Sequence, residues 1–536
     1  MSADIQLIRF APELILLIGA CVVLTAGATK SSLRSTWVSG LALFVLGLAL
    51  WETCRQGNST DGFAAFGLSI TPLAYYTRFI TLSIGLLIVL VNWRQPVALE
   101  RGEYMALILF SLLGVLLTAL ANDLIVLFFA IELVSVPTYV LIALSREDRR
   151  AAEAAVKYFF LGALSAAVLA YGLSFLYGAA GTTTIWSFAE GIATTNMPLG
   201  HAIGPITVIG LMLVFAGLAF KVGAVPFHVY VPDVYEGAAS PLTGMLGFVP
   251  KMAGFVALIK IMAAFHWSLP AELNWMIWIL AALTMTVGNV LALLQRNVKR
   301  MLGYSSIAHT GYMLIALMVG PMAGRGPLHD GVAALLFYMA VYGAMNLGAF
   351  ALLATMRKGD RDAETLDDIA GVARRAPIAT FALAVCIFSL MGFPPTAGFL
   401  GKLYVFSSAF SLPESHAFHG PLIALAIIGV VNSAIAAAYY LRIVGAAYMN
   451  EEIEEPTPIG GIPVRLGLGL CALPLLLLFV RPALVLDDAR RASSAIQSAI
   501  VQGQTHSRST AGGSSVVDDG LEDPVSSLIA GGDSRP

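Results

Sequence analysis

Charged residues and cysteines are scarce in this sequence, and each shortage excludes a class of protein. Only 12% of the 536 residues are charged and 58% are hydrophobic, against roughly 25% charged residues in an ordinary soluble domain. Water therefore cannot be the main solvent of this chain. The formal net charge is −2, and no run of Lys and Arg with interleaved aromatic residues indicates a nucleic-acid surface. The composition excludes a soluble globular protein and a nucleic-acid-binding protein.

Ligands for redox cofactors and metals are equally scarce. Four cysteines lie far apart without a CxxC pair, at Cys21, Cys54, Cys386 and Cys471. This spacing supports neither an iron–sulfur cluster nor a zinc site. The eight histidines form no pattern typical of paired haem ligands. We therefore expect no cofactor and no metal on this chain, so that any redox centre would lie on another chain.

The hydrophobic residues fall into long blocks that predict an all-α integral membrane protein. Most blocks can cross about 30 Å of hydrocarbon at 1.5 Å per residue. Because many blocks follow the first one, we interpret it as a membrane helix and not as a cleaved signal. The fourteen expected spans are 11–29, 35–52, 73–93, 103–121, 124–144, 155–178, 204–224, 241–264, 273–294, 301–321, 331–356, 377–392, 421–448 and 464–480, with a short apolar segment at 397–411. The polar tail, 486–536, is expected to be disordered.

Basic residues predict the orientation of these spans. They gather in the loops after odd-numbered spans, at Lys30, Arg34, Arg94, Arg101, Arg146, Arg149, Arg150, Arg296, Lys299, Arg300, Arg357, Lys358, Arg361, Arg374 and Arg375. Loops after even-numbered spans hold little beyond Arg55 and Arg325. Since loops rich in Lys and Arg stay in the cytoplasm, both termini are expected on the other side.

Two segments contain helix-breaking residues. In 213–241 an apolar run meets Pro226, and in 389–406 a similar run meets Pro394 and Pro395. A proline inside a span removes a hydrogen bond, so the helix breaks where protein or a wet cavity satisfies the freed backbone. The two breaks lie five spans apart, which predicts two inverted repeats, as in many transporters. Ordinary proline kinking is the alternative.

Ionisable residues inside the apolar blocks are the candidate functional residues. Glu132 costs about 2.5–3.5 kcal/mol to place in a membrane and therefore needs a partner. Lys221, two spans further on and close to Pro226, is the natural one. Burial and a nearby carboxylate shift the proton affinity of a lysine in opposite directions. Such a pair can therefore hold or release a proton as its geometry changes.

Further candidates are Lys251, Lys402 and two histidines. Lys251 follows a proline within a span, and Lys402 lies just past the second break; either lysine can alternatively extend to an interface. His228 follows the first break, and His309 lies among hydroxyl side chains. Histidine transfers protons near neutral pH, but a buried histidine can equally be a simple hydrogen-bonding group.

Three segments carry a resemblance to a known family. They are 217–243 (GLAFKVGAVPFHVYVPDVYEGAASPLT), 290–314 (VLALLQRNVKRMLGYSSIAHTGYML) and 388–406 (FSLMGFPPTAGFLGKLYVF). These segments resemble the antiporter-like subunits of respiratory NADH-quinone oxidoreductase, complex I, a family shared with Mrp-type sodium/proton antiporters. The similarity covers about 11–450, and within the family 153–183 and PDVYEGAASP look like subunit N. A long polar tail is outside the family's pattern.

The resemblance implies about fourteen helices, with inverted five-helix repeats at spans 4–8 and 9–13 and broken helices 7 and 12. It divides the chain into an N-terminal three-helix region (1–102), a first repeat (103–264), a second repeat (265–450), a last membrane helix (451–485) and the tail (486–536). The family's proton-carrying positions correspond to Glu132, Lys221, Lys251, Lys402, His228 and His309. The related subunit M is expected to carry glutamate where this chain has Lys402.

The resemblance also implies the function. It is proton translocation in a bacterial inner membrane, driven by electron transfer from NADH to quinone. NADH, FMN, iron–sulfur clusters and quinone would be bound by partner subunits, and the expected neighbours are subunit M, small subunits such as K and J, and lipid. Two alternatives stay open: an Mrp-type cation/proton antiporter, and a non-catalytic assembly protein whose buried charges only pair helices.

Overall fold

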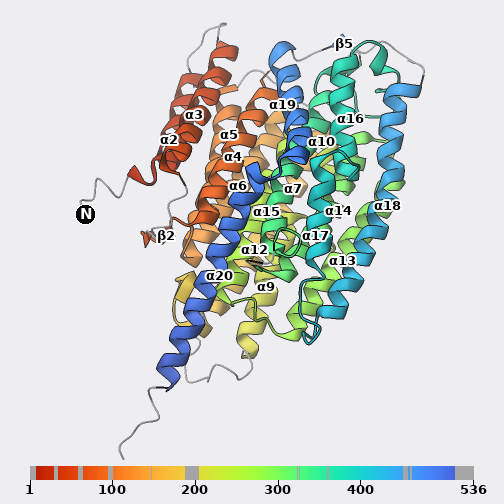
Figure 1. Ribbon diagram of the computed structural model, residues 1–536. Helices are drawn as coiled ribbons and strands as arrows, with labels where there is room; N and C mark the ends of the chain where they lie inside the picture. Colours follow the sequence, from red (N-terminus) through yellow and green to blue (C-terminus); the bar gives the residue numbers. More distant parts are fainter. Residues whose placement is uncertain are drawn as a thin grey trace, which may run out of the picture.

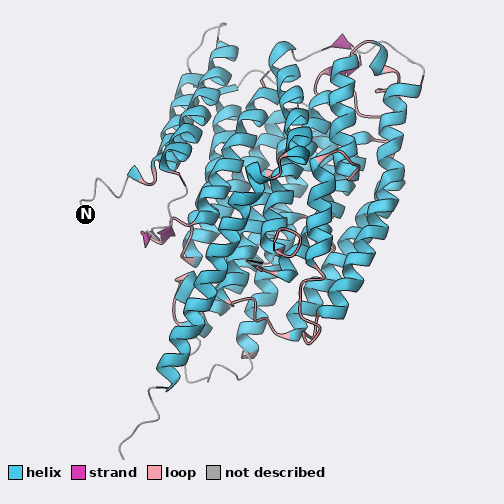
Figure 2. Cartoon of the chain, viewed as in Figure 1, coloured by secondary structure: helices cyan, strands magenta, loops and turns pink. Residues whose placement is uncertain are grey.

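The computed structural model describes residues 8–28, 34–57, 64–93, 101–146, 148–187, 204–322, 324, 326–358, 361–450, 457–458 and 461–512. Most of these residues are helical, and Figures 1 and 2 show the helices running side by side in one bundle. The first half contains α2 (Ala11–Ala28), α3 (Arg34–Gln56), α4 (Pro72–Val91), α5 (Arg101–Leu120), α6 (Leu124–Ser145), α7 (Arg149–Ala180), η1 (Ile185–Ser187), α9 (Pro205–Val222), α10 (Tyr230–Gly237), α11 (Ser240–Leu246) and α12 (Val249–Ala264).

The second half contains α13 (Ala271–Leu293), α14 (Val298–Val319), α15 (Gly331–Leu353), η2 (Val372–Arg374), α16 (Pro377–Met391), α17 (Ala397–Ser408), α18 (His419–Met449), α19 (Gly461–Val480) and α20 (Ala483–Gly512). Short β-strands lie in the loops between helices and pair with one another. β1 (Ala64–Ala65) pairs with β2 (Leu68–Ser69), and β3 (Met356–Lys358) pairs antiparallel with both β4 (Arg361–Asp362) and β5 (Thr457–Pro458).

Every span expected from the sequence overlaps a helix. Among the described residues, twelve helices are long and apolar enough to cross a membrane, and Ala11–Gly27 and Pro377–Met391 are shorter apolar helices. The expected span 241–264 differs, because it consists of α11 and α12 separated by Gly247 and Phe248. A proline lies in the first turn of each of these two helices, where its missing N–H breaks no hydrogen bond.

The two predicted breaks end their first helices in the same way. α9 ends at Gly223 with φ of 74°, and α16 ends at Gly392 with φ of 83°. Glycine adopts this left-handed conformation without steric cost. The chain then passes the prolines and resumes as α10 after the first break and as α17 after the second. Each break therefore separates the end of one helix from the start of another, with exposed residues such as Phe227 and Phe393 between them.

The centre of the bundle is formed by α12, α14 and α15, which are buried on all sides. The outer helices expose large apolar side chains such as Phe160, Leu164 and Ile427. Lipid is the natural solvent for such a surface. Polar groups on the three central helices are consequently shielded from lipid.

The expectation of a disordered tail from residue 486 differs from the structure, which continues as α20 to Gly512. Figure 1 shows this helix crossing the bundle and extending beyond its lower end. Buried side chains recur every three or four residues and face α4 and α15, at Leu486, Ala489, Ala492, Ile496 and Ile500. This spacing gives a helix one apolar face although its average composition is polar. The rest of the tail, 513–536, lies outside the described residues.

Candidate functional site

Glu132 on α6 and Lys221 on α9 form an ion pair inside the bundle. Lys221 Nζ donates to Glu132 Oε1 at 2.9 Å and to Ser135 Oγ at 2.7 Å. Ser135 lies one turn after Glu132 and therefore shares its helix face. The side chain of Lys221 is 4% exposed and that of Glu132 is 19% exposed. The structure thus joins the two residues that the sequence predicted as partners.

Local structure explains why Lys221 lies at this position. It occupies the last turn of α9, where the negative end of the helix dipole favours a cation. Gly254 of α12 packs directly against this turn, because a Cβ on it would lie 2.7 Å from Val222 Cγ1. The break after α9 thereby brings Lys221 and the central helix α12 close together.

Lys251 on α12 is buried and bonds to α14. Its Nζ donates to the backbone carbonyl of Ser306 and to Ser306 Oγ, the latter at 2.6 Å. Thr310 links this site to the first break, since its hydroxyl lies 2.7 Å from the Val222 carbonyl and 3.3 Å from the Ser306 carbonyl. Lys251 does not extend to an interface, the alternative allowed by the sequence, because it is 3% exposed.

His309 on α14 lies between hydroxyl groups on two other helices. Its Nδ1 is 2.5 Å from the Tyr338 hydroxyl, and its Nε2 is 2.9 Å from the Tyr440 hydroxyl. Tyr440 also bonds to Ser305, the neighbour of Ser306. His309 and Lys251 are therefore connected through adjacent serines on one helix.

Lys402 on α17 lies at the second break. Its Nζ donates to the Met391 carbonyl at 2.9 Å and to Ser433 Oγ at 2.8 Å. The amine also lies 5.2 Å from the centre of the Tyr312 ring, which packs edge-on against His309. The Met391 carbonyl is one of those freed where α16 ends, so the lysine satisfies part of the break. Lys402 lines a cavity of about 570 Å³.

Five of the six predicted residues thus lie in a row, joined directly or through intervening Ser, Thr and Tyr residues, which we call the buried row: Glu132, Lys221, Lys251, His309 and Lys402. The sixth, His228, does not join it. Its side chain is half-buried beside the first break, and its Nδ1 has no hydrogen-bond partner among the described residues. The structure therefore separates the two histidines.

Tyr338 and Tyr342 on α15 contact the buried row but were not predicted from the sequence. Tyr338 bonds to His309, and the Lys251 amine lies 5.4 Å from the centre of the Tyr342 ring. The two tyrosines are four residues apart, so they lie on the same helix face. That spacing of hydroxyls in an apolar span was the available signal.

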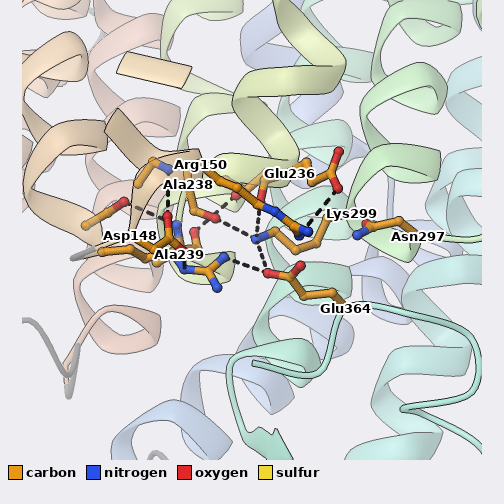
Figure 3. A network of polar contacts seen from close by, with 12 residues as sticks. Asp148, Arg150, Glu236, Ala238, Ala239, Asn297, Lys299 and Glu364 are labelled. Carbon is orange, nitrogen blue, oxygen red and sulfur yellow. Dashed lines mark hydrogen bonds and ion pairs between the residues drawn. The ribbon is translucent and has the colours of Figure 1, made fainter. Parts of the chain in front are cut away.

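A second polar network lies where α6, α10 and α14 end or begin, and Figure 3 shows it. Glu364, in the loop between α15 and α16, accepts from Arg146 Nη1 at 2.6 Å and from Lys299 Nζ at 3.0 Å. Lys299 also donates to the carbonyls of Glu236 and Ala238 at the end of α10, at 2.9 and 2.6 Å. We call Arg146, Glu236, Lys299 and Glu364 the Glu364 cluster. It joins the helix of Glu132 to the helix of His309.

The charge of Glu364 is stabilised by this environment. Burial raises the pKa of the carboxyl, but the charges of Lys299 and Arg146 outweigh it and lower the pKa below the ordinary 4.5. A carboxylate whose pKa is depressed in the folded state stabilises that state above its unfolded pKa. The stabilisation is then lost as the pH falls from about 4.5 through the folded pKa.

Replacing Glu364 with glutamine is expected to lower stability at neutral pH. The change leaves the fully buried Lys299 without its carboxylate, and losing one partner of a buried pair costs about 3 kcal/mol, the lower end of the usual range. The thermal unfolding midpoint of the detergent-purified protein, compared with the parent at pH 7 and at pH 4, measures this loss of stability. The variant should also lose less stability on acidification than the parent.

The matched control is Glu153→Gln, because Glu153 pairs with Lys157 at an exposed position. Exposed pairs contribute about 0–1 kcal/mol, so this variant should unfold close to the parent. Equal unfolding midpoints for the two variants would contradict the predicted stabilisation of the fold by Glu364.

Within the ranges that the structure describes, no group of three or more His, Cys, Asp or Glu side chains could hold a metal ion.

Comparison with known proteins agrees with this architecture. A family model described as "NADH:quinone oxidoreductase/Mrp antiporter, TM" matches residues 121–435. NADH-quinone oxidoreductase subunit N of Rhodospirillum rubrum is 36% identical over 489 residues, covering 90% of this chain and 96% of that protein. Subunit N 2 of Koribacter versatilis is 38% identical over 501 residues, covering 91% and 97%.

Two solved structures are similar throughout. A chain of respiratory complex I from Thermus thermophilus matches with a TM-score of 0.73 and 31% identity, covering 89% of this chain and 98% of that one. A chain of the Mrp complex from Dietzia sp. matches with a TM-score of 0.75 and 19% identity, covering 93% and 99%. The second likeness is one of fold alone.

Proposed function

This chain belongs to the NADH:quinone oxidoreductase/Mrp antiporter family of membrane subunits, and we propose that it moves protons along the buried row. Its relatives named subunit N support a place in an NADH-quinone oxidoreductase, as a proton-translocating membrane subunit. Electron transfer from NADH to quinone takes place on partner subunits, which hold the NADH, FMN, iron–sulfur clusters and quinone. The chain contributes no redox centre of its own.

The ion pair of Glu132 and Lys221 carries this proposal. An ammonium held by one carboxylate changes its proton affinity when the distance between them changes. A movement of a neighbouring subunit that separates the pair would therefore release a proton. Moving one charge against about 150 mV costs roughly 3.5 kcal/mol. A change in the distance within a buried ion pair can supply a free energy of this size.

The other residues pass the proton on. Lys251 and His309 relay it through Ser306, Ser305 and the Tyr440 hydroxyl. Lys402, beside its cavity at the second break, exchanges it with water or with the next subunit. His228, half-buried at the first break, is the proposed point where water meets the first half of the row.

The finer organisation belongs to the same proposal. The helices form two inverted repeats, at spans 4–8 and 9–13, and each repeat contributes one broken helix to the row. The similar ends of α9 and α16 support this arrangement. The Glu364 cluster lies on the cytoplasmic side and both termini on the other side of a bacterial inner membrane. Subunit M and small subunits such as K and J are the proposed neighbours.

Lys402→Met tests the row at its far end. The variant keeps the side-chain volume and removes the charge, so proton translocation by the whole complex should fall about tenfold, below the 10²–10⁴-fold typical for a positioned proton-transfer group. The measurement is acidification in sealed vesicles during NADH oxidation. Arg442→Gln is the control, because the exposed Arg442 donates, among the described contacts, to the carbonyls of Leu293 and Gln295 at and just after the end of α13.

Normal acidification by the Lys402→Met complex would remove this residue from the path. Proton flux driven by a sodium gradient without NADH would instead assign the chain to the antiporters of its family. Both measurements use the same vesicles.

A further inference from the structure

One buried lysine belongs neither to the row nor to the Glu364 cluster. Lys260 is on α12, nine residues after Lys251, and is 3% exposed. Its Nζ donates one hydrogen bond, to the Ala121 carbonyl at 2.7 Å. An ammonium has three N–H donors. Two donors of Lys260 therefore have no acceptor among the described residues.

The charge of Lys260 is also unpaired within the described part of the chain. Lys221 and Lys299 each have a carboxylate within 3.0 Å, whereas Lys260 bonds only to a carbonyl following the C-terminal end of α5. A buried ammonium without a carboxylate has to be compensated by water or an anion, or it loses its proton. Lys251 and Lys402 in the row share this property, since their partners are neutral oxygens.

The Lys260 side chain lines a cavity of about 510 Å³. Ala495 and Ile496 of α20 form one wall, and Ser69, Asn122 and Trp186 contribute to the others. The buried Oδ1 of Asn122 has no hydrogen-bond partner among the described residues. Since a water molecule occupies about 30 Å³, the cavity has room for several waters beside these polar atoms.

Lys260 faces the end of the bundle opposite the Glu364 cluster. α12 follows α11, and the backbone just before α11, at Ala238, belongs to the surroundings of Lys299. Nine residues further along α12 correspond to about 13 Å at 1.5 Å per residue. If the Glu364 cluster is cytoplasmic, Lys260 therefore lies toward the opposite side of the membrane.

We propose that Lys260 is the group that exchanges protons between the buried row and the non-cytoplasmic solution, through the cavity under α20. The neutral amine takes a proton from water that enters along α12 from Lys251. The ammonium then returns one proton to water in the cavity, so that no net charge stays on the chain. This inference rests on the proposed function of the row.

The first test compares Lys260→Met and Lys260→Arg in the complete complex. Proton translocation in sealed vesicles should fall about tenfold in the methionine variant and recover at least in part in the arginine variant, which keeps the charge. Equal complex content in the membranes, measured by quantitative immunoblotting, shows that the effect is not one of assembly. Full translocation by Lys260→Met would overturn the inference.

Lys221→Ala, measured in parallel, separates this inference from the function on which it rests. Loss of translocation in Lys221→Ala together with normal translocation in Lys260→Met would exclude Lys260 from the proton path and leave the proposed role of the row intact. Normal translocation in both variants would contradict the row itself.

The second test asks whether the cavity is reached from outside. In a background in which the exposed Cys21 and Cys54 are serine, Ala495→Cys on the cavity wall should react with a membrane-impermeant maleimide added to the non-cytoplasmic side. The attached group should slow proton translocation about tenfold, as removal of Lys260 does. Ser494→Cys, on the same turn but not lining the cavity, should be labelled without this loss. Equal translocation after labelling at both positions would contradict an exit through the cavity.

Discussion

Replacing Lys221 with alanine is expected to stop nearly all proton translocation by this subunit's complex. The amine is the only group that bonds to both Glu132 and Ser135 among the described contacts, and no neighbouring side chain replaces it. Removing a positioned proton-transfer group costs about 10²–10⁴-fold, and we expect about 10²-fold here. The rate of acidification in sealed vesicles during NADH oxidation measures the loss.

Two controls accompany this prediction. Lys221→Arg retains a cation next to Glu132 and should preserve assembly, yet a guanidinium stays protonated, so translocation should still be low. Arg442→Gln should translocate like the parent. A Lys221→Ala complex that acidifies normally would exclude the relay, whatever its effect on stability.

Glu132→Leu combined with Lys221→Leu is expected to restore stability but not function. The single change Glu132→Leu leaves a buried ammonium unpaired, which costs about 3–5 kcal/mol. Replacing both charges with apolar residues is often neutral or stabilising by about 1–4 kcal/mol. The double variant should therefore assemble as well as the parent or better.

The readouts of this double variant separate a relay from a structural pair. Complex content and the thermal unfolding midpoint report the packing, and acidification reports translocation. We expect complex content and the unfolding midpoint to recover while acidification does not. Recovery of all three would mean that the pair only joins α6 to α9, as in an assembly protein.

Different residues of the row were predictable to different degrees. Glu132 and Lys221 stand out in the sequence because no other charge lies near them in apolar spans. Lys251 and Lys402 required the breaks and the family resemblance, since a lysine near a span end can also extend to an interface. His228 fits the same family pattern, but the structure leaves it outside the row.

The membrane class, the positions of the spans and the two breaks follow from the amino-acid sequence alone. These features depend on local properties, namely the hydropathy of about twenty consecutive residues and the chemistry of proline and glycine. The contacts between distant residues, in contrast, are visible only in the folded protein. His309 meets Tyr440, which is 131 residues away, and Lys260 faces a cavity that residues of α20 line. Hydrogen bonds between residues so far apart depend on how the helices pack, and no local pattern records that packing.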